Sequence, residues 1–256
     1  MDCQQLIRDQ ELVNDYVKRI GESFIAESGS KAYPIYDGVM NPQLYAEAKP
    51  RIAWVLKEPY DEIDADGTPI GGDWPLSAIF DTENVYDKIK GNRTLNTMSY
   101  VTYGIMNNLE YADMPWIYEN PAVANSLKSI VHMNISKFPA KTYTYMGNLA
   151  AYYETWRPIL LFQLKVYKPQ VVIFGNVMPY FQKDLGLEEI MKSDDDRMVN
   201  YAVKDNCLYI DAWHPCLRGK SDAYKEKYVN GIVKTVMEHA SEINLDFPAN
   251  PFKPGL

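Results

Sequence analysis

Residues 51–62 read RIAWVLKEPYDE, an apolar run that passes without a linker into charged residues and a proline. Residues 51–56 are apolar on both alternating faces, which is typical of a strand buried on both sides. Glu58 and Pro59 follow almost at once. Such a strand belongs to the interior of a parallel sheet, so the sequence places a carboxylate directly at one edge of that sheet.

Three further apolar runs of strand length follow, each ended by loop signals. They are residues 129–135, 171–175 and 207–211. Segments of helical period lie between or after them, at 96–110, 147–166 and 222–240. This alternation predicts an α/β fold, a three-layer α/β/α sandwich around a mainly parallel four-stranded sheet.

The whole chain of 256 residues falls in the size range of one α/β domain, so we expect a single domain over 1–256. Residues 4–27 carry apolar side chains at spacings of three and four, which predicts an amphipathic helix packed on the core as scaffold. Residues 242–256 are expected to form a C-terminal tail.

Composition restricts the classes of partner and cofactor. A net charge of −8 argues against indiscriminate binding to nucleic acid, although a local basic patch is compatible with it. No apolar run reaches the roughly 20 residues that cross a bilayer, and no secretory pattern is present, so we expect a cytoplasmic protein without a membrane partner. Three cysteines form no C-x-x-C pair, and we expect neither a metal nor an organic cofactor.

Polar chemistry gathers in three loops that follow strands. They read KEPYDE (57–62), NISKFPAK (134–141) and DAWHPCLRGK (211–220). In a parallel sheet such loops share one edge, where ligands bind. We therefore expect Glu58, Asn134 and His214 to meet there. A carboxylate base, an amide and an imidazole together suit hydrolysis of a bond to a leaving anion.

These loops resemble three motifs of the uracil-DNA glycosylase superfamily, in the same order. LKEPYD at 56–61 resembles the strand-to-loop motif G-Q-D-P-Y-H or G-E-A-P-G, Asn134 matches the asparagine that ends a second strand, and His214 begins a His-Pro motif after the last strand. The resemblance covers about residues 50–220. Lys57, Glu58 and Asp61 differ from the residues usual in the first motif, so the chain resembles a divergent member.

The resemblance implies a hydrolase that cleaves the N-glycosidic bond of uracil or another damaged base in DNA. Glu58 would orient the attacking water and stabilise the sugar cation, and His214 would donate a hydrogen bond to the departing base. Asn134 would read the edge of the base. Each residue also has a structural interpretation: a cap or partner of Lys57 for Glu58, a satisfied strand-end histidine for His214, and a turn former for Asn134.

Further residues are expected around these three. The other candidates for substrate binding are Lys57, Tyr60, Trp74 and Phe80, with aromatic rings available to stack on an extruded base. The candidates for DNA binding are Lys137, Leu217, Arg218 and Lys220, together with Lys141. Leu217 resembles the family's wedge into the vacated base stack. The glycine- and proline-rich segment 66–75 suggests a mobile lid, and His132 is expected beneath a helix.

Two other functions remain open. The same fold would serve an enzyme or binding protein for a free nucleoside, nucleotide or other small molecule, because fold does not fix function. The chain would also suit an inactive interaction module whose motif residues only cap elements. A serine hydrolase is disfavoured because no G-x-S-x-G elbow precedes His214.

Overall fold

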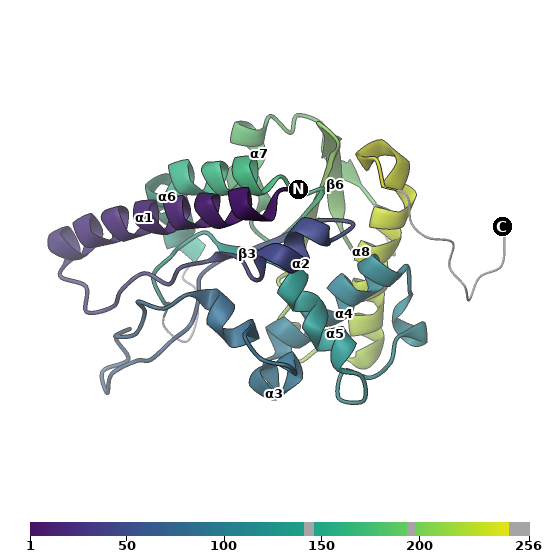
Figure 1. Cartoon of the computed structure of the whole chain (residues 1–256), viewed down its shortest axis with the longest axis horizontal. Coiled ribbons are helices and arrows are strands. Elements are labelled where there is room, and N and C mark those ends of the chain that lie inside the picture. The colour runs from purple at the N-terminus through teal and green to yellow at the C-terminus, as the bar shows by residue number, and fades with distance from the viewer. Residues whose placement is uncertain (141–145, 194–197, 246–256) are drawn as a thin grey trace.

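A mixed sheet with the strand order β1-β3-β2-β4-β7-β6-β5 forms the centre of the computed structural model (Figure 1). The structure describes residues 1–140, 146–193 and 198–245. The strands are β1 (Gly38–Val39), β2 (Ile52–Leu56), β3 (Ile130–Asn134), β4 (Val171–Gly175), β5 (Met191–Lys192), β6 (Asn200–Lys204) and β7 (Cys207–Ala212). Strands β3, β2, β4 and β7 run parallel. They are the four strands predicted from the sequence, which confirms the parallel centre.

The expected size of the sheet was wrong, because the described residues contain three additional antiparallel strands. Strands β1 and β5 have two residues each, too short to show an alternating pattern. Strand β6 pairs with β7 across a tight turn in which Asp205 and Asn206 both have positive φ angles, 51° and 58°. Asp and Asn tolerate this conformation, and an Asp-Asn pair between two apolar runs is a hairpin signal.

The long helices α1, α4, α6 and α8 begin and end close to where periodicity predicts them, and the shorter helices were not predicted. The α-helices are α1 (Cys3–Ser28), α2 (Pro42–Glu47), α3 (Val85–Ile89), α4 (Arg93–Asn107), α5 (Pro121–Asn125), α6 (Met146–Tyr167), α7 (Met178–Leu185) and α8 (Asp222–Glu238). The side chain of Asp2 accepts a hydrogen bond from the Gln4 amide at the start of α1, and Gly29, with φ 68°, ends that helix. These are a usual N-cap and a left-handed C-cap.

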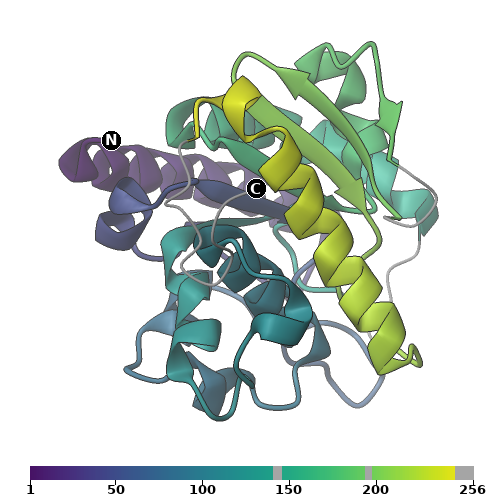
Figure 2. The ribbon, with the colours of Figure 1, turned by 90° about the vertical axis from the view of Figure 1, so that its right-hand side faces the viewer.

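The sheet is covered by helices on both faces. Along β2, Trp54 and Leu56 pack into a core with α3, α4, α5 and α8. Ala53 and Val55 point to the other face, into a core with α1, α2, α6 and α7. Figures 1 and 2 show these two helical layers on opposite sides of the strands. Alternation along a fully buried strand therefore produces the three layers that the sequence predicts.

Both ends of the described chain are helical. Helix α1 contacts α6, as expected of a scaffold helix. After α8 the chain forms a short 3-10 helix, Ala240–Ile243, and residues 246–256 of the expected tail lie outside the described residues. Within the described part of the chain, no helix combines the length and apolar character needed to span a bilayer.

Candidate functional site

The loops after β2 and β3 run side by side beyond the ends of both strands. The Ser136 amide donates to the Lys57 carbonyl oxygen at 3.0 Å. The Ala140 amide donates to the Pro59 carbonyl oxygen at 2.8 Å. Proline lacks an N–H, so this arrangement uses only its acceptor. The paired backbones fix Glu58 between Lys57 and Pro59 at the edge of the sheet, which explains why the carboxylate follows the strand so closely.

His214 reaches the same edge because Gly175, the last residue of β4, has no side chain. A Cβ atom at Gly175 would lie 2.6 Å from Cδ2 of Leu56, 3.3 Å from Cδ of Pro215 and 3.7 Å from Cα of His214. The turn after β7 therefore packs over the end of β4 and towards β2. Strand ends that are not direct neighbours in the sheet are brought together by this close approach.

His214 is held as a neutral hydrogen-bond donor. The Cys216 amide donates to its Nδ1 at 3.3 Å, so the proton of the neutral ring lies on Nε2. Burial lowers the pKa of His214 to about 4, and the positive charge of Lys57 adds to that lowering. The ring is therefore uncharged at neutral pH and presents Nε2–H as its donor.

Glu58 is partly buried and interacts with its neighbour. Burial lowers the pKa of Lys57, and the negative charge of Glu58 opposes this by raising it. Glu58 also lines a cavity of about 630 Å³ beside the C-terminal end of α1. A place in the cavity wall fits a role toward a ligand or water, and the interaction with Lys57 equally fits the structural interpretation.

Asn134 ends β3 with its backbone held on both sides. It is 2% exposed, and its amide donates to Oδ2 of Asp37 at 2.6 Å. Its carbonyl oxygen accepts from Nζ of Lys137 at 2.9 Å. Leu56, the last residue of β2, is its partner in the register of the sheet. Asn134 therefore lies beside the start of the Lys57–Glu58 loop, as the sequence predicts.

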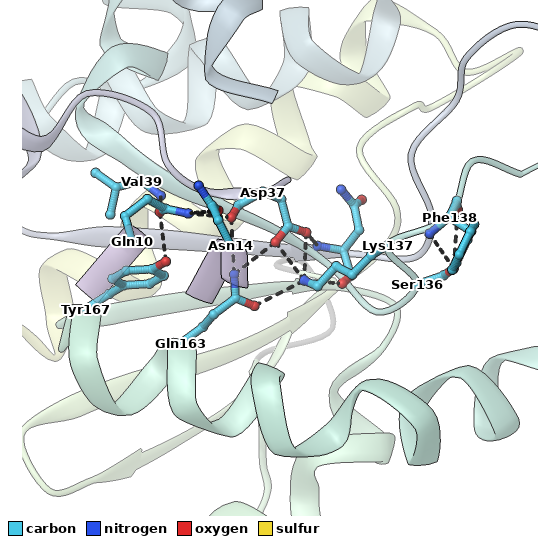
Figure 3. Close-up of polar contacts among 10 residues, drawn as sticks. Gln10, Asn14, Asp37, Val39, Ser136, Lys137, Phe138, Gln163 and Tyr167 are labelled. Carbon is cyan, nitrogen blue, oxygen red and sulfur yellow. Dashed lines mark hydrogen bonds and ion pairs between the residues drawn. The ribbon is translucent and has the colours of Figure 1, made fainter. Parts of the chain in front are cut away.

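Lys137 corrects one expectation. We expected it to contact phosphate groups, but its side chain is fully buried and its ammonium is 2.7 Å from Oδ1 of Asp37 (Figure 3). An ammonium enclosed in this way does not reach a polyanion at the surface. The sequence alone does not distinguish a phosphate-binding lysine from a buried, ion-paired lysine.

The aromatic candidates separate into three environments. Phe80 is 3% exposed and packs in the core with α3 and α4, so its expected role as a stacking ring was wrong. Trp74 is partly buried, and its Nε1 donates to Oδ2 of Asp61 at 2.6 Å. Tyr60 is 54% exposed at the edge of the sheet. Tyr60 is thus the ring that is free to meet a large ligand.

Residues 66–75, expected to form a mobile lid, are tied down at several points. Oδ2 of Asp61 also accepts from the Gly72 amide at 2.7 Å, and the Trp74 carbonyl oxygen accepts from the Tyr36 amide at 3.1 Å. Gly72 has φ 107°, and a Cβ there would collide with the carbonyl oxygen of Tyr33. Gly72 is therefore explained by the close approach of its backbone to that of Tyr33.

The loop after His214 places the remaining DNA-binding candidates at the surface. Leu217 has φ 40° and packs partly against the core that contains α4 and α8. Arg218 and Lys220 are exposed, and Nζ of Lys220 lies 4.6 Å from the centre of the Tyr224 ring. Lys141 lies outside the described residues.

Of two further buried residues of the site, one was not identified from the sequence. Asp37, which holds Asn134, precedes the two-residue strand β1 and belongs to no motif. His132 was expected beneath a helix. It is 6% exposed, and neither of its ring nitrogens has a hydrogen-bond partner among the described residues. Burial lowers its pKa to about 4; the negative charge of Asp37 opposes this lowering, and the positive charge of Lys137 adds to it.

In residues 1–140, 146–193 and 198–245, no group of three or more His, Cys, Asp or Glu side chains could hold a metal ion. Comparison of the chain with models of protein families finds no match, and comparison with curated proteins finds none. Function therefore follows only from the chain's own residues.

The charge state of His214 is directly measurable. We expect its ring to titrate near pH 4 in a pH series of NMR spectra, with the neutral form protonated at Nε2. Replacing Lys57 by Met removes a positive charge, so the pKa of His214 should rise while burial keeps it below the ordinary 6.5. Because the folded chain binds this proton less readily than the unfolded chain, His214 also weakens folding as the pH falls from 6.5 towards 4.

Lys220→Met is the matched control, since it removes the charge of an exposed lysine at the end of the loop that contains His214. A wild-type His214 that titrates near 6.5, or equal shifts in the two lysine variants, would contradict the assignment.

Proposed function

We propose that the chain is a divergent member of the uracil-DNA glycosylase superfamily that hydrolyses the bond between a damaged base, with uracil the first candidate, and its sugar in DNA. The observation that carries the proposal is the neutral His214, whose Nδ1 accepts from the Cys216 amide. Its donor on Nε2 lies at the same edge as a carboxylate and an asparagine. This combination suits a reaction that develops a negative charge on one group and a positive charge on another.

In that reaction the C–N bond breaks and its electron pair leaves with the base, while positive charge develops on the sugar. Nε2–H of His214 donates to the carbonyl oxygen of the departing base as negative charge accumulates there. Glu58 stabilises the sugar cation by its charge, orients the attacking water and accepts a proton from it. The side-chain amide of Asn134 presents an acceptor and a donor, which match the imide edge of a pyrimidine.

Binding to DNA would depend on a local basic surface, because the chain as a whole carries a net charge of −8. Arg218 and Lys220 are exposed four and six residues after His214, where phosphates flanking an extruded nucleotide would lie. Tyr60 offers an exposed ring on the side of Glu58. Phosphate contacts of this kind position a substrate without reading its sequence.

Base release from uracil-containing single- and double-stranded oligonucleotides tests the reaction. The abasic product is cleaved with alkali and quantified. We expect release by the wild type and a loss of about 10²- to 10⁴-fold in Glu58→Gln and in His214→Ala, the range for removing a general base or a transition-state donor.

Glu11→Gln, on the exposed face of α1, and His239→Ala are the controls, since both replace the same residue types outside the site. No release by the wild type from either strand form would contradict the proposed reaction. Intact DNA binding without release of any base would favour an inactive member.

The DNA-binding surface has a separate test. Arg218→Glu should weaken binding to a short duplex and reduce the slope of log K against log salt by about 1, because one phosphate contact is lost. Arg8→Glu, the same change on the exposed face of α1, is the control and should leave the slope unchanged. Equal binding by Arg218→Glu and the wild type would contradict the proposed phosphate contact.

A second candidate function is supported by the cavity that Glu58 lines. Its volume of about 630 Å³ lies within the range of small-molecule sites, about 300–1,000 Å³. Its walls include the rings of Phe138 and Trp156, whose centres are 6.0 Å apart, and the charged side chain of Lys31. Aromatic walls with a carboxylate and an ammonium suit a nucleoside or nucleotide.

A panel of nucleosides and nucleotides in a thermal-melting assay distinguishes this candidate. A ligand that binds only the folded chain stabilises it by about 2.7 kcal/mol at 100 times its Kd, so the melting temperature should rise. Tyr152→Ala removes one wall of the cavity and should abolish the rise. A panel that leaves the melting temperature unchanged would argue against a small-molecule site.

A further inference from the structure

A buried ion pair lies directly behind Asn134. Asp37 is 1% exposed and Lys137 is fully buried, and Nζ of Lys137 is 2.7 and 2.8 Å from the two carboxylate oxygens. Gln163 completes the group, since its Nε2 donates to Oδ1 of Asp37 at 2.9 Å and its Oε1 accepts from Lys137 at 3.1 Å. Figure 3 shows the carboxylate, the ammonium and the amide pointing toward one another.

Both members of the pair bind the backbone of Asn134. Oδ2 of Asp37 accepts from the Asn134 amide at 2.6 Å, and Nζ of Lys137 donates to the Asn134 carbonyl oxygen at 2.9 Å. The peptide groups on both sides of the Asn134 Cα are thereby fixed. Rotation of the backbone at the end of β3 would break a charge-assisted hydrogen bond to one partner or the other.

The pair is itself attached to the helices behind the sheet. Gln10 of α1 donates to the Asp37 carbonyl oxygen at 3.0 Å and accepts from the Val39 amide at 2.8 Å. Tyr167, the last residue of α6, donates its hydroxyl to Oε1 of Gln10 at 2.8 Å. Figure 3 shows this chain of contacts leading from α1 and α6 to Asp37. The carboxylate cannot shift without disturbing two helices.

Stability alone does not account for such a pair. Removing two charges from water is costly, and apolar residues of similar volume are often as stable in the same place. A site that must hold a side chain in one orientation, by contrast, needs support from fully satisfied neighbours. The two charges here converge on the backbone of one residue, Asn134, which lies at the carboxyl edge of the sheet.

We propose that Asp37 and Lys137 are positioning residues that fix the backbone of Asn134 and so aim its side-chain amide at the base. The identity of that ligand rests on the proposed function. Glu58 and His214 follow other strands, β2 and β7, whereas both members of the pair bind the backbone of Asn134. Loss of the pair should therefore impair recognition of the base more than bond cleavage, which is a change in KM and in base preference with a smaller change in kcat.

The double variant Asp37→Leu with Lys137→Met tests this role. It removes both charges together, so no unpaired charge is buried, and we expect a melting temperature near that of the wild type. The preference for uracil over cytosine, measured as the ratio of kcat/KM, should fall at least tenfold and match that of Asn134→Ala. If the pair had only a structural role, the double variant would keep the base preference of the wild type as well as its melting temperature.

Tyr167→Phe is the matched control, because it removes a hydrogen bond of the same chain that does not touch Asn134. It should keep the base preference. If the double variant does not fold, Asp37→Asn supplies the comparison, since it removes the negative charge and replaces one of two oxygens, each of which accepts two hydrogen bonds, by an NH2 group that cannot accept. An unchanged base preference in the folded variant would overturn the positioning role.

Amide hydrogen exchange separates this proposal from the proposed reaction. The Asn134 amide should exchange slowly in the wild type and at least tenfold faster in the double variant, while the Met133 amide of the same strand stays protected. This result would support the positioning role even if the wild type releases no base. Equal exchange of the Asn134 amide in both proteins would overturn it.

Discussion

The site depends on backbone pairing between β2 and β3 that does not stop where the strands stop. Hydrogen bonds continue from Leu56 and Ile135 to Pro59 and Ala140, so two loops that would otherwise be independent form one surface. Loops on the edge of a sheet are normally its most variable part. Here the rigidity of the parallel centre extends outward by several residues, and Glu58 is held within that extension.

Burial sets the charges of the site. Desolvation keeps two imidazoles, His132 and His214, neutral, and it also lowers the pKa of Lys57. The two rings thus offer polar groups without carrying positive charge themselves, and in the proposed reaction His214 would face the base on which negative charge develops. A neutral donor stabilises that anion by a hydrogen bond without protonating it, whereas a cationic imidazole is acidic enough to transfer its proton. Behind this layer, the full charges of Asp37 and Lys137 contact the backbone of Asn134 and compensate each other.

The sequence predicts the parallel strands and long helices because period and apolar content are local properties. It also brings Glu58, Asn134 and His214 to one edge, since topology requires it. It cannot predict whether a loop or short-helix side chain points outward or inward, which is why Lys137, after β3, and Phe80, at the end of the 3-10 helix Leu76–Phe80, were assigned to the surface of the site. Asp37 was missed because its partners lie about 100 and 126 residues away in the chain. Only the Asp205-Asn206 turn carried a local signal for a missed strand.

The short strands at the two margins of the sheet also affect how the protein behaves at high concentration. Strand β1 at one margin and β5 at the other have two residues each, so neither presents a long row of free amides and carbonyls. Long exposed margins invite another chain to add a strand and begin aggregation. The apolar strands β2, β3, β4 and β7, which would be the most adhesive segments if uncovered, are flanked on both sides within the chain itself.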